Sequence, residues 1–413
     1  MKRRTFLGAA SLAATCAIAP RIARGARPRV AIVGGGFGGS ACALFLKHAD
    51  PSIDVTLVDP DARYVTCPMS NEAIVGARSI DSLTVTREGL RRAGVRFVRA
   101  RAKAIDADAR ALRLDDGARI ACDACVVSPG IRFLWGTPDG YDEAAANRMP
   151  HAWEAGIETT RLAELLRAMD DGGTFAISVP AGLMRCPPGP YERASLVAEF
   201  LAQHKPRSKV LIFDANNRFP RQEAFSAAWK DLYGDRIEWI PVTEGGAVLR
   251  VDVRTNTLHT SSGAHRVALA NVIPPQAPGA FALDAGLCEG HGWCPVDPAT
   301  FESTRVAGVH VIGDACIADA MPKAASSALS QARQCATAIL ARFAHRPVPT
   351  PELDSVCYSA LALDRSLAIR ARFRTDAAHI VADAAQTPSA PSPAEHAAAE
   401  RWYLTIRKAA FGG

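Results

Sequence analysis

Three glycines near the start of the chain have the spacing of a loop that cradles a pyrophosphate. Gly34, Gly36 and Gly39 follow an apolar stretch, Arg29 to Val33, and precede a helix expected over Ser40 to His48. The first glycine of such a loop permits a tight turn, the second lets the backbone approach the phosphates, and the third lets the helix pack on the strand. The N-terminus of the helix then faces the anion.

An acidic residue follows where this kind of site needs one. A second apolar stretch, Asp54 to Val58, ends at Asp59, twenty residues after Gly39. A carboxylate at this position typically accepts hydrogen bonds from ribose hydroxyls. A lone glycine motif is weak evidence, but strand, loop, helix, strand and terminal acid in this order predict a dinucleotide site rather than a structural glycine turn.

A second nucleotide motif lies about 280 residues further on. A strand that begins at Val309 ends in Gly313-Asp314-Ala315, and a long helix is expected to open at Met321-Pro322-Lys323-Ala324 and run to Leu340. This pattern resembles the second FAD motif of flavoproteins with two dinucleotide domains. The resemblance implies that Gly313, Asp314 and Lys323 contact FAD, with Asp314 on the ribityl chain. It also implies a split FAD domain with an insert.

The insert is expected to have a strand-helix-strand frame over Thr174 to Pro180, about Tyr191 to His204, and Lys209 to Asp214. The glycine spacing for a nicotinamide cofactor is missing, and prolines remove backbone N–H donors where phosphates would bind. Cys186 lies among these prolines. A rigid turn before a helix start would orient its sulfur, and the helix dipole with Arg185 or Arg193 would favour its thiolate. By itself, Cys186 could equally be an ordinary loop cysteine.

Longer strings resemble the flavoprotein subunit of flavocytochrome c sulfide dehydrogenase, a relative of sulfide:quinone oxidoreductases. These strings are Tyr64 to Glu72, Pro150 to Trp153, Arg185 to Ser195, Gly292 to Asp297, Ile312 to Ala315 and Cys357 to Ser359.

The resemblance implies roles for three of the eleven cysteines. It makes Cys67 the residue that holds FAD through a covalent thioether. It makes Cys186 and Cys357 a redox-active disulfide, with Glu192 as an acid beside it. Sequence spacing does not select this pair, and Cys294 is an alternative partner for Cys186.

Cys16 belongs to the N-terminal segment interpreted below as a signal peptide. The other cysteines are interpreted as core residues, and no metal site is expected. Cys122 and Cys125 have C-x-x-C spacing, but this spacing crosses the start of a strand and should point the side chains to opposite faces.

The resemblance further implies oxidation of sulfide to sulfane sulfur or polysulfide, with FAD passing electrons to a cytochrome c subunit. The chain contains no C-x-x-C-H motif, so the haem c is expected on that separate partner. Two alternatives stay open. One is a sulfide:quinone oxidoreductase, which would need an amphipathic membrane-docking helix. The other is a non-catalytic flavin-binding assembly factor.

The predicted fold class is α/β. It comprises two Rossmann-like domains of the glutathione-reductase type, the second without a nicotinamide site, and a small C-terminal segment. The FAD domain is expected at 27–150 and 278–345, the second Rossmann-like domain at 151–277, and a flavin-binding or interface region at 346–413. Residues 1–26 are interpreted as a signal peptide.

The N-terminal residues form a basic, then apolar stretch. Arg3-Arg4 before Phe6-Leu7 is similar to a twin-arginine export signal, which predicts a periplasmic protein exported folded. An ordinary secretory signal is the alternative. Five basic residues lie in this stretch, so removing it lowers the net charge from +6 to +1. A near-neutral chain gives no support for nucleic-acid binding. No later segment predicts an integral membrane span, because none has eighteen uninterrupted apolar residues.

Overall fold

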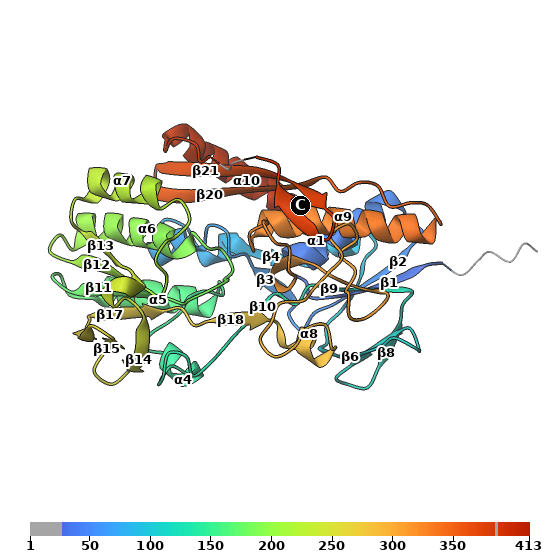
Figure 1. Ribbon diagram of the computed structural model, residues 1–413, viewed down its shortest axis with the longest axis horizontal. Helices are drawn as coiled ribbons and strands as arrows, with labels where there is room; N and C mark the ends of the chain where they lie inside the picture. Colours follow the sequence, from blue (N-terminus) through green and yellow to red (C-terminus); the bar gives the residue numbers. More distant parts are fainter. Residues whose placement is uncertain (1–26, 385–386) are drawn as a thin grey trace, which may run out of the picture.

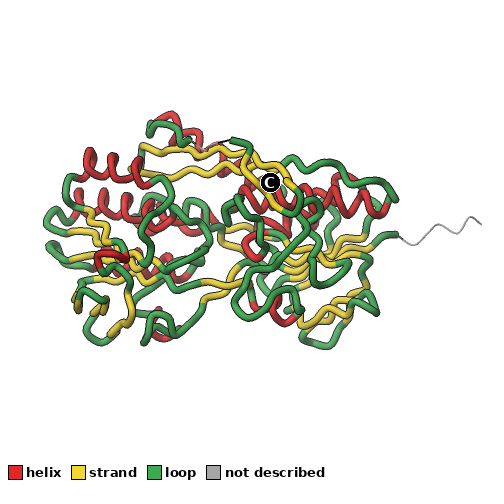
Figure 2. The backbone as a smooth tube through the Cα atoms, viewed as in Figure 1, coloured by secondary structure: helices red, strands yellow, loops and turns green. Residues whose placement is uncertain are grey.

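The computed structural model describes residues 27–384 and 387–413. The predicted signal peptide, residues 1–26, lies outside the described residues. Figure 2 shows two lobes that each contain a sheet with helices packed on it.

The first lobe is built on a five-stranded parallel sheet with strand order β19-β9-β1-β2-β5. Its central strands are almost wholly buried, which explains their near-continuous apolar sequences. Because β19 pairs with β9, the turn at Gly313 lies near the glycine loop that follows β1. The strands are β1 (Arg29–Val33), β2 (Asp54–Val58), β5 (Arg96–Val98), β9 (Ala124–Val127) and β19 (Val309–Val311).

Two helices, α1 (Phe37–Ala49) and α9 (Ala325–Phe343), pack against each other on this sheet (Figure 1). Helix α1 begins three residues earlier than predicted, so Gly38 and Gly39 are part of it. A Cβ atom on Gly39 would lie 2.0 Å from the carbonyl oxygen of Gly34. The close packing of helix on strand therefore requires glycine here.

The second lobe has a four-stranded parallel sheet of order β13-β12-β11-β17. Its strands are β11 (Thr174–Val179), β12 (Lys209–Asp214), β13 (Ile237–Ile240) and β17 (Leu269–Val272), and its helices are α5 (Ile157–Ala168), α6 (Gly189–His204) and α7 (Gln222–Tyr233). The antiparallel pair β10 (Ile131–Phe133) and β18 (Gln276–Pro278) connects the lobes. The domain boundary expected after residue 277 falls inside β18.

The C-terminal segment folds into a three-stranded antiparallel sheet and a helix. It forms β20 (Leu353–Ala362), β21 (Arg365–Asp376), β22 (His379–Ala382) and α10 (Pro393–Phe411). Strand β20 packs on α6 of the second lobe and on α9 of the first, so this sheet lies along both lobes (Figure 1). Within the described residues, no helix is both long and apolar enough to span a membrane.

The shorter elements complete the lobes. They are β3 (Arg63–Val65), β4 (Thr84–Thr86), β6 (Ala102–Asp106), β7 (Ala111–Leu114), β8 (Arg119–Ala121), β14 (Val248–Asp252), β15 (Thr257–Thr260), β16 (Gly263–Arg266), α2 (Ser70–Ile74), α3 (Glu88–Arg92), α4 (Glu143–Ala146) and α8 (Ala280–Asp284), with 3₁₀ turns at Ile80–Leu83, Val242–Glu244 and Gly313–Ala315. The α/β architecture with two Rossmann-like sheets and a C-terminal segment confirms the predicted fold class.

Candidate active site

Residues of both lobes and of the C-terminal sheet line a cavity of about 720 Å³. It is lined by the glycine loop, the Gly313 turn, the loop before α2, the loop before α6, and β20. Nine of the eleven predicted site residues line it: Gly34, Gly36, Asp59, Cys67, Cys186, Glu192, Gly313, Asp314 and Cys357. Gly39 and Lys323 lie behind its wall.

The glycine-loop end of the cavity fits a dinucleotide. Gly34 has a φ of +94°, and a Cβ atom there would lie 2.1 Å from the carbonyl oxygen of Ser128. This tight turn brings the N-terminus of α1 to the cavity wall, where its N–H groups suit a pyrophosphate. Asp59 accepts a hydrogen bond of 2.6 Å from the Gly35 amide and pairs with Arg87 at 3.2 Å. The predicted ribose-binding carboxylate is thus held in the cavity lining.

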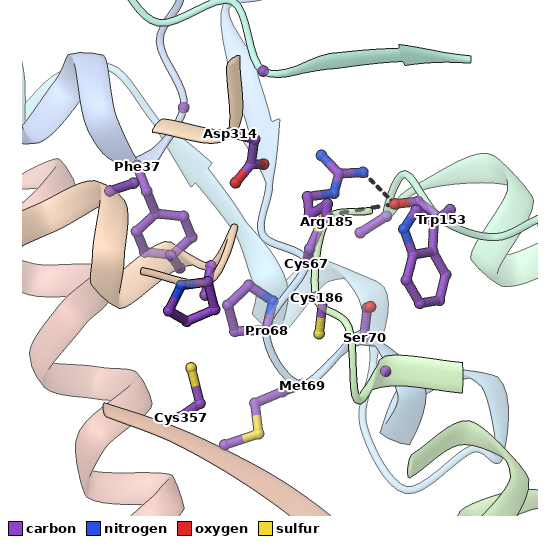
Figure 3. A pocket seen from close by; sticks show the side chains of 18 of the residues that line it. Phe37, Cys67, Pro68, Met69, Ser70, Trp153, Arg185, Cys186, Asp314 and Cys357 are labelled. Carbon is purple, nitrogen blue, oxygen red and sulfur yellow. Dashed lines mark hydrogen bonds between the residues drawn. The ribbon is translucent and has the colours of Figure 1, made fainter. Parts of the chain in front are cut away.

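The second motif forms the 3₁₀ turn Gly313–Ala315. Gly313 has a φ of +77°, which favours glycine, and its amide donates to Gln331 Oε1 at 2.7 Å. The Asp314 carboxylate faces the cavity (Figure 3). Burial raises the pKa of Asp314, while the charges of Arg185 and Lys323 lower it. Both dinucleotide motifs therefore open on one cavity, as a split FAD domain requires.

Lys323 is predicted to contact the cofactor, but its side chain does not line the cavity. Helix α9 begins at Ala325 rather than Met321, so Lys323 lies in the non-helical segment before the helix. Its Nζ donates to the carbonyl oxygens of Asp314 and Cys316 at 2.8 and 2.9 Å, and lies 3.7 Å from the centre of the Trp293 ring. Its own carbonyl accepts from the Cys186 amide at 2.8 Å. Lys323 therefore positions two cavity segments from behind.

Cys67 lies in the loop between β3 and α2 and lines the cavity. Its Sγ lies 4.0 Å from the carbonyl oxygen of Trp153, which also accepts a hydrogen bond from Arg185 (Figure 3). The next turn is tight because Met69 adopts a φ of +67°. A cysteine held beside the cofactor space suits the predicted flavin tether.

Cys186 and Cys357 come from distant parts of the chain and line the same cavity as free thiols. Figure 3 shows them on opposite sides of Pro68 and Met69. Cys186 precedes α6 with a φ of +52°. Cys357 is in β20, with its Sγ 3.6 Å from Ser326 Oγ and 3.8 Å from Ser355 Oγ.

The expected thiolate character of Cys186 is wrong for this structure. Although the side chain is exposed to the cavity, withdrawal from bulk solvent raises the pKa of Cys186, and the charge of Glu192 raises it further. Arg185 opposes this shift only weakly. Burial also raises the pKa of Cys357, although the Ser326 and Ser355 hydroxyls lower it. Both sulfurs therefore rest as thiols.

Glu192 belongs to a buried polar network that the sequence did not reveal. Its Oε1 accepts from Asn71 Nδ2 at 2.8 Å and its Oε2 from the Ala360 amide at 3.3 Å. Burial raises the pKa of Glu192 to about 7, although the hydrogen bond from Asn71 lowers it. The acid therefore changes charge near neutral pH, between the segments that carry the two cysteines.

Arg193 anchors this network. Its guanidinium is buried and donates to Asn71 Oδ1 at 3.0 Å, Asn271 Oδ1 at 2.8 Å, and the carbonyl oxygens of His151 and Ala152 at 2.8 and 2.7 Å. Burial lowers the pKa of Arg193 to about 10, so the side chain stays protonated at neutral pH. Asn71 lies in one of the family-like strings, but only the fold brings it to Arg193.

We expect Arg193→Met to lower the free energy of unfolding by about 3–5 kcal/mol, because several buried acceptors would lose their donor. Urea denaturation of the purified protein measures this change. Arg207→Met is the matched control: Arg207 is 76% exposed and pairs with Asp171, so its loss should cost about 1 kcal/mol or less. Equal losses in the two variants would contradict a special role for Arg193.

In the second lobe, the carboxylate at the end of β12 is paired with the protein's own side chains. Asp214, at the end of β12, is fully buried. It accepts hydrogen bonds from Tyr191 Oη at 2.6 Å and Trp239 Nε1 at 2.8 Å. The Phe219 ring stacks on Tyr191 with centroids 3.8 Å apart. The carboxylate that could hold a ribose is therefore occupied by the protein's own side chains.

The remaining described cysteines lie outside the cavity. Cys294 is fully buried against Cys288 and Cys316, which disfavours it as a partner of Cys186. The expectation that Cys122 and Cys125 point to opposite faces is wrong, because their thiols are hydrogen-bonded to each other. Cys122 precedes β9, so strand alternation does not govern its direction. Both are buried in the core, as expected.

The fold and the cavity define an FAD-dependent oxidoreductase with two Rossmann-like domains. Residues 28–148 match the family described as pyridine nucleotide-disulphide oxidoreductase, and residues 159–274 match the family described as sulfide dehydrogenase (flavocytochrome c) flavoprotein chain, central. The chain belongs to the flavoproteins related to flavocytochrome c sulfide dehydrogenase and sulfide:quinone oxidoreductase.

Individual relatives agree with this family. The sulfide dehydrogenase (flavocytochrome c) flavoprotein chain of Chlorobaculum thiosulfatiphilum is 60% identical over 43 residues, which are 10% of this chain and 90% of that one. The sulfide-quinone reductase of Aquifex aeolicus is 27% identical over 115 residues, 28% of this chain and only 26% of the relative. The solved structure of the Aquifex aeolicus sulfide:quinone oxidoreductase has a TM-score of 0.74, with 16% identity over 94% of this chain and 93% of that one.

Proposed function

We propose that the protein oxidises sulfide to sulfane sulfur through a Cys186–Cys357 disulfide and passes the electrons, by way of FAD, to a cytochrome c subunit. The observation that carries this proposal is that Cys67, Cys186 and Cys357, from three distant segments, line the FAD cavity together. A tether and a dithiol beside one flavin site suit sulfur redox chemistry better than they suit a storage or assembly role.

The two cysteines perform the sulfur chemistry. Hydrosulfide attacks the Cys186 sulfur of the disulfide, the S–S bond breaks, and Cys186 carries a persulfide while Cys357 leaves as the thiolate. A second hydrosulfide removes the sulfane sulfur as hydrogen disulfide, leaving Cys186 reduced. Re-forming the disulfide releases two electrons. Bound FAD supplies the acceptor for these electrons and can release them singly, which suits a haem.

Glu192 is suited to move the protons of this cycle. Its carboxyl group accepts a hydrogen bond from the Ala360 amide on the strand that carries Cys357, and Glu192 lies in the first turn of α6, six residues after Cys186. With a pKa of about 7, it can accept a proton from a thiol and return it near neutral pH. General acid–base groups work best when their pKa lies near the operating pH.

The acceptor is proposed as a cytochrome c subunit, and FAD as covalently bound to Cys67. The Chlorobaculum relative is named as a flavoprotein chain of a flavocytochrome c, and this chain has no C-x-x-C-H motif of its own. The twin-arginine-like start of the chain supports action in the periplasm, where a disulfide can persist. A quinone acceptor is the alternative, supported by the Aquifex structure.

Anaerobic sulfide titration of the purified flavoprotein tests this function. We expect sulfide to bleach the bound flavin, and added oxidised cytochrome c to restore its absorbance. If a short-chain quinone restores the absorbance and cytochrome c does not, the electron acceptor is a quinone and the protein is a sulfide:quinone oxidoreductase. Flavin that sulfide does not bleach would contradict an enzyme and favour the assembly factor.

The raised pKa of Glu192 predicts a pH-dependent stability difference. Between the ordinary glutamate pKa of 4.5 and about 7, the folded protein holds a proton that the unfolded chain releases. This stabilisation is complete below pH 4.5 and is lost as the pH rises through 7. Glu192→Gln avoids the buried charge. We therefore expect its melting temperature, relative to the wild type, to rise between pH 5 and pH 8.

Differential scanning fluorimetry of the two proteins at both pH values measures this difference. The exposed Glu88 provides a control, because Glu88→Gln should shift the melting temperature equally at pH 5 and pH 8. A pH-independent difference for Glu192→Gln would show that the acid titrates normally.

A further inference from the structure

A surface loop near the FAD site holds two cysteines that the catalytic chemistry does not use. Cys288 and Cys294 bracket residues 289–292, which are exposed, while the two cysteines are 5% and 0% exposed. Their thiols are hydrogen-bonded to each other. Gly286 lies two residues before Cys288, and Gly290 lies between the two cysteines. Their φ values of +71° and +56° suit glycine and allow the chain to turn at both positions.

The backbone fixes Cys294 in place. Its amide donates to the carbonyl oxygen of Ala315 at 2.9 Å, and its carbonyl accepts from the Ile317 amide at 2.8 Å. Cys288 lies between the two glycines, whose backbone is less restricted than that of other residues. One thiol is therefore fixed, and the other can adjust to the geometry that a disulfide requires.

The two other thiol pairs of the described residues lack this freedom. Cys42 and Cys335 are fully buried between helices α1 and α9. Cys125 belongs to β9, which is hydrogen-bonded on both sides within the parallel sheet. Of these three thiol pairs, only Cys288 and Cys294 bracket a run of four exposed residues.

We propose that Cys288 and Cys294 form a second disulfide, separate from the catalytic pair. It forms by exchange with an external low-molecular-weight or protein disulfide. One cysteine thiolate attacks that disulfide and expels a first thiol, and the other cysteine then attacks the mixed disulfide and expels a second. The two cysteines lose two electrons, the external disulfide gains them, and the two thiol protons pass to the released thiols.

This bond braces the wall of the FAD cavity. The loop that it closes carries Trp293, whose ring covers the Lys323 ammonium at 3.7 Å. Lys323 in turn holds the carbonyl of Asp314 and the amide of Cys186. The disulfide therefore fixes the outermost residue of a chain of contacts that ends at two cavity residues, while remaining outside the cavity itself.

Tryptic mapping of the full protein tests the proposal without measuring activity. No lysine or arginine lies between Arg266 and Arg305, so one peptide, residues 267–305, contains Cys288, Cys294 and no other cysteine. The holoprotein is equilibrated with oxidised glutathione, denatured, alkylated and digested without reductant. We expect this peptide unalkylated and two hydrogen masses lighter than the dithiol, and doubly alkylated after reduction.

Controls separate this pair from its neighbours. Cys316, which pairs with Cys294 only through the backbone, falls in a different peptide, and Cys316→Ser should leave the mass shift unchanged. Cys294→Ser should make Cys288 fully alkylatable. A doubly alkylated 267–305 peptide before reduction, or a crosslink from it to the Cys316 peptide, would overturn the proposal. Neither result depends on whether sulfide reduces the flavin.

Discussion

Replacement of Cys357 by serine should leave flavin bound and abolish its bleaching by sulfide. Serine keeps the size of the side chain and can hydrogen-bond to Ser326 and Ser355, which contact Cys357 Sγ. It cannot form the disulfide that hydrosulfide attacks. Loss of a reacting sulfur removes the pathway rather than weakening it, so we expect the rate of flavin reduction to fall by about 100-fold or more.

Stopped-flow absorbance under anaerobic conditions measures this rate. Cys335→Ser is the matched control, because Cys335 is buried in α9 and does not line the cavity. It should reduce flavin at the wild-type rate. If Cys357→Ser bleaches as fast as this control, the assignment of Cys357 is wrong, whereas loss of flavin from Cys357→Ser would indicate a structural role.

Replacement of Cys67 by alanine should convert covalently bound flavin to flavin that acid releases. Cys67 lines the cavity beside the Trp153 carbonyl, where a thioether could reach the cofactor. Both dinucleotide motifs stay intact in this variant. We therefore expect flavin to bind, but essentially all of it to remain in the supernatant after trichloroacetic acid precipitation.

Cys42→Ala provides the comparison, since Cys42 is a buried residue of α1 outside the cavity. Its flavin should stay with the pellet, as in the wild type, and mass spectrometry should find the adduct on the peptide that contains Cys67. Acid-extractable flavin in the wild type would reject covalent attachment but leave the FAD site itself untouched.

The sequence was most informative where structure depends on local geometry. The turn at Gly34, the acid at Asp59 and the Gly313 turn follow from backbone conformation and from strands that end at one edge of a sheet. These features repeat at fixed spacing in any Rossmann-like domain. Short-range rules therefore located both halves of the cofactor cavity.

The sequence predicts the directions of individual side chains less well. The sequence pattern predicts that Lys323 contacts the cofactor, yet helix α9 starts later than predicted and Lys323 lies against the Trp293 ring. The Cys122 and Cys125 thiols meet because one of them precedes its strand. An error of a few residues at the end of an element is enough to move a side chain from one face to another.

The link from Arg193 through Asn71 to Glu192 was also beyond prediction. Asn71 lies more than a hundred residues from the other two, and a buried arginine without a carboxylate partner has no sequence pattern. The pKa of Glu192 depends on burial that only the assembled lobes create. Similarly, the raised pKa of Cys186 reverses a prediction made from its neighbours in sequence.

The residues expected to bind the cofactor and the second sulfur of the proposed disulfide lie in different parts of the chain. Both nucleotide motifs precede residue 345, whereas Cys357 arrives on a strand added after them and held between α6 and α9. A protease that removed the last sixty or so residues would leave both phosphate-binding turns in the remaining polypeptide. Such a fragment lacks the second sulfur, so yellow colour in a preparation reports cofactor retention and not catalytic competence.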